Sequence, residues 1–193
     1  LRELYLRRSQ GEDINPYAQI HLDRITGDLL NSLAFTIISN DLFLPWAQFQ
    51  MGDQRYSKDR GYVFEQQFNE NTQGYLDKPL AAYRQAEEEA IIPMVYLTPS
   101  IVNDGRRLMI SPLDVSFMMI SPIGLQKPGS AEVDAVDFRR LFRAQRADSL
   151  RFLSALRMNA TYPYILPNVQ LPSVPEIEVV DAGFRDNYGV LSA

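Results

Sequence analysis

The chain has 193 residues, of which 46% are hydrophobic and 22% charged, and its formal net charge is −5. This composition is typical of a globular chain that buries a core, and the negative charge removes the usual driving force for binding nucleic acid. Cysteine is absent and His21 is the only histidine, which excludes disulfides, thiol chemistry and zinc sites rich in cysteine or histidine. We therefore expect no nucleic-acid partner and a chemistry of carboxylates and hydroxyls.

The first part of the chain has a helical pattern. The apolar residues of segment 1–8 share one face, and Asn15 followed by Pro16 predicts the start of another helix that runs through residue 33. Further helices are expected over 58–68 and 75–89. No uninterrupted apolar run reaches the roughly 18 to 20 residues of a membrane-spanning helix, so we expect none.

Short apolar runs in the middle of the chain predict strands. Residues 89–98 are rich in β-branched side chains, as in a buried strand. Asn103-Asp104-Gly105 supplies turn residues before a further strand at 107–111, and 115–120 is another candidate.

The last third is expected to contain one long helix, or two, over 135–158, followed by a strand over 176–181. Helices that alternate with short apolar strands predict an α/β fold of three layers, α/β/α, with a largely parallel sheet.

The most informative segment is 179–189, Val-Val-Asp-Ala-Gly-Phe-Arg-Asp-Asn-Tyr-Gly. Sites in parallel sheets gather beyond the carboxyl ends of the strands, which is where Asp181 is expected. Gly183 permits a backbone path that a side chain would block. Asp181 is thus a candidate for a fixed base, and the alternative is that it only caps the turn. Asn187 either braces this turn or caps the next element.

Segment 179–189 resembles the Asp-Gly-Gly element of the patatin-like phospholipases, which are serine acyl hydrolases with a Ser–Asp dyad. Residues 156–163 resemble the family's Ala-Ser-Ala-x-x-Pro stretch, and residues 92–98 resemble the strand that precedes it. Asp59-Arg60-Gly61 with Glu65, and residues 103–108, are similar to a bacterial branch of the family. Together the similarity extends over nearly all of the chain. Position 182 is Ala where the family usually has Gly.

The nucleophile of this family lies in a Gly-x-Ser-x-Gly elbow, preceded by a glycine-rich loop that forms the oxyanion hole. None of the 13 serines fits that pattern. The resemblance therefore implies that 1–193 is the C-terminal portion of one patatin-like domain, incomplete at its N-terminus. The elbow and the oxyanion loop are expected upstream of Leu1, in the same polypeptide.

The resemblance implies a lipid acyl hydrolase of the esterase or phospholipase A type, in which Asp181 is the catalytic base and Gly183 and Asn187 support its turn. A Ser–Asp dyad needs no histidine, metal or organic cofactor, and this portion alone is expected to be inactive. The alternative is a non-catalytic patatin-like module that binds lipid or another protein.

Three further features bear on a lipid substrate. A possible acyl pocket, or else a connector packed under the sheet edge, is expected at Tyr162, Tyr164, Ile165 and Leu166. Six arginines between 139 and 157 either engage anionic lipid headgroups or form a solvated helix face. The aromatic and apolar residues of 42–49 either form an interfacial patch or pack in the core. The expected partners are a lipid ester and a peripheral membrane contact, with the cytoplasm or a membrane surface as the favoured location.

Overall fold

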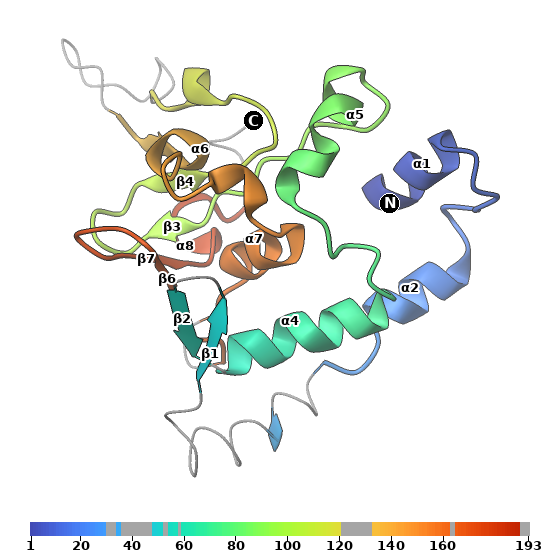
Figure 1. Cartoon of the computed structure of the whole chain (residues 1–193), viewed down its shortest axis with the longest axis horizontal. Coiled ribbons are helices and arrows are strands. Elements are labelled where there is room, and N and C mark those ends of the chain that lie inside the picture. Colours follow the sequence, from blue (N-terminus) through green and yellow to red (C-terminus); the bar gives the residue numbers. More distant parts are fainter. Residues whose placement is uncertain are drawn as a thin grey trace.

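The computed structural model describes residues 1–29, 34–35, 48–51, 54–57, 59–120, 133–162 and 165–189 (Figure 1). Its α-helices are α1 (Arg2–Ser9), α2 (Gln19–Ile25), α4 (Arg60–Asn71), α5 (Arg84–Glu88), α6 (Phe138–Leu141), α7 (Phe152–Asn159) and α8 (Gly183–Asp186). The 3-10 helices are η2 (Leu80–Tyr83), η3 (Ser116–Met118) and η5 (Ala147–Ser149). The strands are β1 (Gln48–Met51), β2 (Gln54–Ser57), β3 (Ser100–Ile101), β4 (Arg107–Met109), β5 (Ala135–Asp137), β6 (Val169–Leu171) and β7 (Ile177–Val180).

The expected α/β character is confirmed by a five-stranded mixed sheet, in the order β5-β4-β3-β7-β6, that is accompanied by helices. The prediction of a largely parallel sheet is wrong for the described strands, because β4 and β5 are the only parallel pair and the other three pairs are antiparallel. The turn predicted at 103–105 explains the antiparallel pairing of β3 with β4. It closes β3 onto β4 as a hairpin, with Gly105 at φ 74° and the Ile101 amide donating to the Arg106 carbonyl at 2.8 Å.

Of the two alternatives expected over 135–158, one long helix is wrong, and two α-helices, α6 and α7, are present together with β5 and η5 (Figure 1). Asp137 ends β5 and starts α6, since its carboxylate accepts hydrogen bonds from the Arg139 and Arg140 amides. Arg146 adopts a left-handed backbone at φ 61°, which no helix can continue through. The spacing of apolar residues did not reveal these breaks. Phe138 and Phe142 are both buried and lie four residues apart, which is also the spacing expected along one face of a continuous helix.

Two of the strands expected in the middle of the chain are absent from the described residues. In 89–98 a single bridge from Leu97 to Ile110 replaces the expected strand, and 115–120 contains η3. The strands expected at 107–111 and 176–181 are confirmed as β4 and β7. The expected helix over 75–89 is shorter and consists of η2 and α5.

The helix expected over 58–68 is confirmed as α4, where the Asp59 carboxylate accepts a hydrogen bond from the Tyr62 amide at 3.0 Å. The helix expected from Asn15 begins later, at Gln19. The Asn15 side chain instead accepts from the Tyr17 amide at 3.1 Å, which closes a local turn. The described residues contain no helix both long and apolar enough to cross a membrane.

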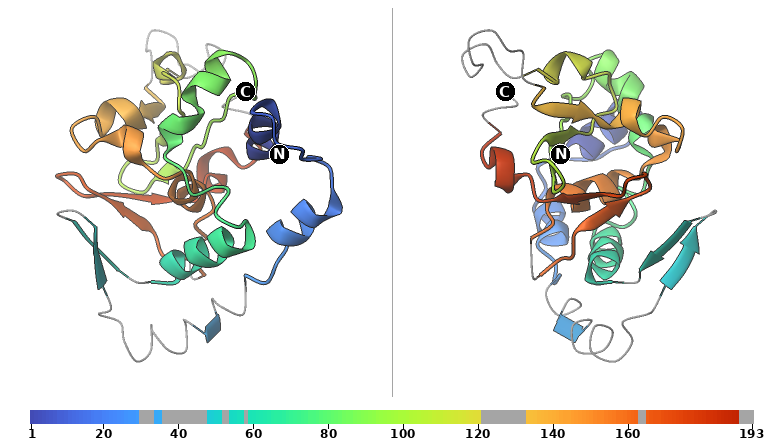
Figure 2. Two further views of the ribbon diagram at one scale, coloured as in Figure 1. Left: turned by 45° about the vertical axis from the view of Figure 1, so that its right-hand side comes forward. Right: turned by 90° about the vertical axis from the view of Figure 1, so that its left-hand side faces the viewer.

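The core lies between the sheet and its helices. α7 packs against β7 and α4 packs against α7, while α8 contacts β3 (Figures 1 and 2). The β1–β2 hairpin forms a separate two-stranded sheet, which projects from the molecule in the right-hand view of Figure 2. Side chains that are at least 98% buried include Leu80, Tyr83, Leu108, Met109, Ile110, Phe142, Leu153 and Val179. The carboxyl end of β7 therefore emerges from a well-packed centre and leads directly to Asp181.

Candidate functional site

Asp181 follows β7 directly and is held by the end of α7. Its backbone amide donates to the carbonyl of Thr161 at 3.0 Å, and the next amide, of Ala182, faces the carbonyl of Asn159 at 3.5 Å. The Asn159 side-chain oxygen accepts from the Thr98 amide at 2.7 Å. Two segments singled out by their motifs, 156–163 and 179–189, therefore lie side by side.

The Asp181 side chain is half-buried, and one of its oxygens closes the turn into α8. Oδ1 accepts the Gly183 amide at 2.6 Å, which is the capping interaction of an Asx turn. No described residue donates a hydrogen bond to Oδ2. Asp181 thus caps its turn through Oδ1, as the alternative considered for it expected.

Gly183 leaves room for the side chains on either side of it. A Cβ at this position would lie 2.7 Å from Asp181 Oδ1 and 3.0 Å from Asn187 Oδ1, so both side chains surround the bare backbone. The structure therefore brings together the three residues expected at this turn. Asn187 is exposed, and its side-chain oxygen faces Gly183.

The expected acyl-pocket residues are distributed differently. Tyr162 is 62% exposed and Ile165 46% exposed, whereas Leu166 is 4% exposed and belongs to the buried set. Tyr164 lies outside the described residues. A cavity of about 410 Å³ is found near the other end of β7 and is lined by Ile101, Asn103, Asp104, Arg106, Val136, Leu141, Pro175 and Ile177. The acyl pocket therefore stays a prediction.

A buried group of charges anchors α8 on the sheet. Arg107 of β4 is 1% exposed and pairs with Asp134 at 3.0 Å and with Asp186 of α8 at 4.0 Å. Arg185, also on α8, forms an ion pair with Asp134. The helix that begins at Gly183 is thereby fixed by charge as well as by packing. The sequence offered one sign of this cluster, a lone arginine in the otherwise apolar strand 107–111.

A second polar group joins α4 to α7. Arg157 lies 3.1 Å from Asp59 and 3.7 Å from Glu65, and Ser154 donates to the other Glu65 oxygen at 2.9 Å. Burial raises the pKa of Glu65, and the Arg157 guanidinium opposes that shift. The residues of the motif at 59–65 thus have a structural role. They hold α7 in place, and the Asp181 turn is hydrogen-bonded to the end of this helix.

Replacing Gly61 by alanine should destabilise the chain. The new Cβ would lie 2.0 to 2.1 Å from three atoms of the Arg157 guanidinium, which must then leave Asp59 and Glu65. In an unhindered helix interior the same change stabilises by about 1 kcal/mol. Here we expect a loss of about 1–3 kcal/mol in the free energy of unfolding, as for an overpacked core, measured by urea denaturation.

The matched control is the same substitution in an Arg157→Ala background. With the guanidinium gone, Gly61→Ala should no longer destabilise and should gain up to about 1 kcal/mol. An equal loss in both backgrounds would show that Arg157 is not the cause.

Comparison with known proteins finds no relative of this chain. No family model, no curated protein and no solved structure matches it. In the part of the chain that the structure describes, no three His, Asp or Glu side chains are grouped so as to hold a metal ion.

Proposed function

We propose that this chain supplies the catalytic aspartate of a lipid acyl hydrolase of the patatin-like type. The observation that supports the proposal is that two hydrogen bonds hold the Asp181 turn in place. Thr161 holds its backbone amide, Gly183 fixes its Oδ1, and both partners come from segments that resemble the family's motifs. Such a turn holds a carboxylate in one place while Oδ2 receives no hydrogen bond from a described residue.

In the proposed reaction, a serine hydroxyl from sequence outside these residues attacks the ester carbonyl of the lipid. Asp181 Oδ2 accepts the hydroxyl proton and passes it to the ester's alcohol, which leaves as the serine oxygen keeps the new acyl bond. Water then attacks the acyl-enzyme and gives one proton to Asp181, which returns it to the serine oxygen as the bond to the acyl group breaks and the fatty acid is released. Oδ1 keeps its bond to the Gly183 amide throughout, so the base does not need to be reoriented between the two steps.

The proposal extends to the fold. We propose that the five-stranded sheet is the C-terminal part of a three-layer α/β/α domain of patatin-like type, whose other strands come from an upstream part of the same polypeptide. The parallel pairing of β4 with β5 supports this, because parallel strands require a crossover connection and are typical of such layered sheets.

A fluorophosphonate probe tests the proposal, because it reacts covalently with an activated serine. A longer polypeptide with a Gly-x-Ser-x-Gly elbow upstream of Leu1 should be labelled, and the same polypeptide with that serine changed to alanine should not. The 193-residue chain alone should remain unlabelled. Labelling of the 193 residues alone, or an unlabelled longer polypeptide that hydrolyses no ester, would refute the proposal.

The second candidate is a lipid-binding module without catalysis. It is favoured by the use of Oδ1 for capping and by Ala182, where the family usually has glycine. The same labelling distinguishes the two candidates, because a non-catalytic module would bind lipid without reacting with the probe.

A further inference from the structure

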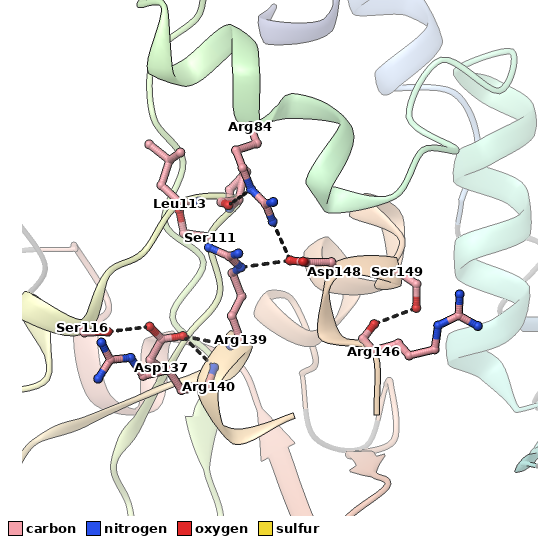
Figure 3. Close-up of polar contacts among 11 residues, drawn as sticks. Arg84, Ser111, Leu113, Ser116, Asp137, Arg139, Arg140, Arg146, Asp148 and Ser149 are labelled. Atoms are coloured by element: carbon pink, nitrogen blue, oxygen red, sulfur yellow. Dashed lines mark hydrogen bonds and ion pairs between the residues drawn. The ribbon is translucent and has the colours of Figure 1, made fainter. Parts of the chain in front are cut away.

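We infer that α6 and the turn that joins it to η5 form a docking surface for a bilayer that contains anionic phospholipid. Its cationic residues are Arg139, Arg140, Arg143 and Arg146, which we call the arginine face. Phe138 and Phe142, in the same segment, are 5% and 2% exposed, with ring centroids 5.0 Å apart. The rings anchor the segment in the core, whereas Arg140, Arg143 and Arg146 are exposed, and the side chains of Arg140 and Arg146 extend toward opposite ends of it (Figure 3).

Only part of this positive charge is neutralised by described residues. Arg84 and Arg139 both point at Asp148, at 2.6 and 3.0 Å from the same oxygen, so that two guanidinium groups share one carboxylate (Figure 3). Arg140 lies 3.6 Å from Asp114 in a pair whose side chains are 63% and 64% exposed. An ion pair this exposed is weak and can exchange its carboxylate for a phosphate.

Arg143 and Arg146 are exposed, and neither has a carboxylate partner among the described residues. The backbone beneath them is fixed, since the Arg146 carbonyl accepts hydrogen bonds from both the amide and the hydroxyl of Ser149, each at 2.8 Å (Figure 3). The left-handed conformation of Arg146 belongs to this turn. The turn therefore presents two cations that have no carboxylate partner among the described residues, on a backbone that is held by hydrogen bonds.

Exposed apolar side chains lie beside the arginine face. Leu141 is 42% exposed, and η3 contributes Phe117, which is 73% exposed. η3 is joined to the start of α6 by the Ser116 hydroxyl, which donates to Asp137 at 3.1 Å (Figure 3). Cations next to exposed apolar groups match a membrane surface, where phosphates meet the arginines and apolar groups enter the acyl boundary.

The negative charge of the whole chain does not oppose this docking. Charges on the surface are screened beyond about 8 Å at physiological ionic strength, so the carboxylates that matter are those close to the arginine face. Among described residues, Asp148 and Asp114 form ion pairs with it, and Asp137, which is 2% exposed, already caps α6. A nucleic-acid backbone would leave Phe117 and Leu141 in water, which favours the bilayer as the partner.

Sedimentation of the 193-residue chain with vesicles tests the inference. Binding is expected to vesicles of phosphatidylserine and phosphatidylcholine, to weaken with added salt, and to be far weaker with phosphatidylcholine alone. Each arginine removed should weaken binding about five-fold, so Arg143→Gln with Arg146→Gln should cost about 25-fold. The control Arg8→Gln with Arg24→Gln, on α1 and α2, removes the same charge and should bind as the unaltered chain does.

A further variant, Phe117→Ser, separates the bilayer from a soluble polyanion. It should weaken binding to the anionic vesicles and leave binding to heparin unchanged. Equal binding to both vesicle types, no vesicle binding, equal effects of the two arginine pairs, or tighter binding to duplex DNA than to vesicles would each overturn the inference. No hydrolysis is measured, so failure here and failure of the proposed hydrolase are distinguishable.

Discussion

Replacing Arg107 by methionine should lower the free energy of unfolding by about 3–5 kcal/mol, measured by urea denaturation followed by circular dichroism. Methionine fills much of the same volume, so the main loss is of charge. Arg107 is 1% exposed between Asp134 and Asp186, and its replacement removes a buried positive charge that faces both carboxylates. Removing one partner of a buried ion pair costs more than the pair itself contributes.

The neighbouring residue provides the control. Arg106 pairs with Asp104 in the exposed β3–β4 turn, where the two side chains are 41% and 39% exposed, so Arg106→Met should cost less than about 1 kcal/mol. Adding Asp186→Asn to Arg107→Met should recover part of the loss, because it removes one of the two negative charges that Arg107 faces. Equal losses for Arg106→Met and Arg107→Met would contradict the assigned role of the buried cluster.

Changing Asp181 to asparagine, in a longer polypeptide that includes the upstream serine, should reduce ester hydrolysis by about 100- to 10,000-fold, the range for loss of a general base. The amide oxygen of asparagine can still accept the Gly183 amide, so the turn and the stability should be preserved. The measurement is the turnover of a chromogenic fatty-acid ester, together with urea denaturation of both proteins.

Asp104→Asn is the matched control, since Asp104 is an exposed carboxylate in the β3–β4 turn and lies outside the Asp181 turn. It should leave turnover within about two-fold of the unaltered protein, as surface changes usually do. Near-normal turnover with Asp181→Asn would remove Asp181 from the mechanism, whatever its effect on stability.

Elements coded by local interactions could be predicted from the sequence. The turn at Gly183 and the start of α4 each depend on residues within a few positions of one another, such as the Asp59 carboxylate and the Tyr62 amide. The same holds for the β3–β4 turn, which was predicted from its Asn-Asp-Gly residues. The antiparallel pairing that this turn produces was not predicted, because the alternation of helices and strands favoured a parallel sheet.

The features that could not be predicted depend on residues far apart in the chain. Arg107 meets Asp134 and Asp186 only after three elements have packed together, and Arg157 meets Asp59 across two helices. Spacing along the sequence contains no information on such pairs. The motifs at 59–65 and 103–108 drew attention to these residues through family resemblance, without indicating their partners.

The end of α7 has a consequence for how Asp181 responds to changes elsewhere. The Thr161 hydroxyl donates to the Arg157 carbonyl at 2.8 Å, and the Thr161 carbonyl accepts the Asp181 amide at 3.0 Å. A displacement of α7 caused on the α4 side is therefore transmitted to the aspartate through two hydrogen bonds and a single residue. Natural variants remote from the turn can in this way alter the orientation of the carboxylate while every residue of the turn itself is retained.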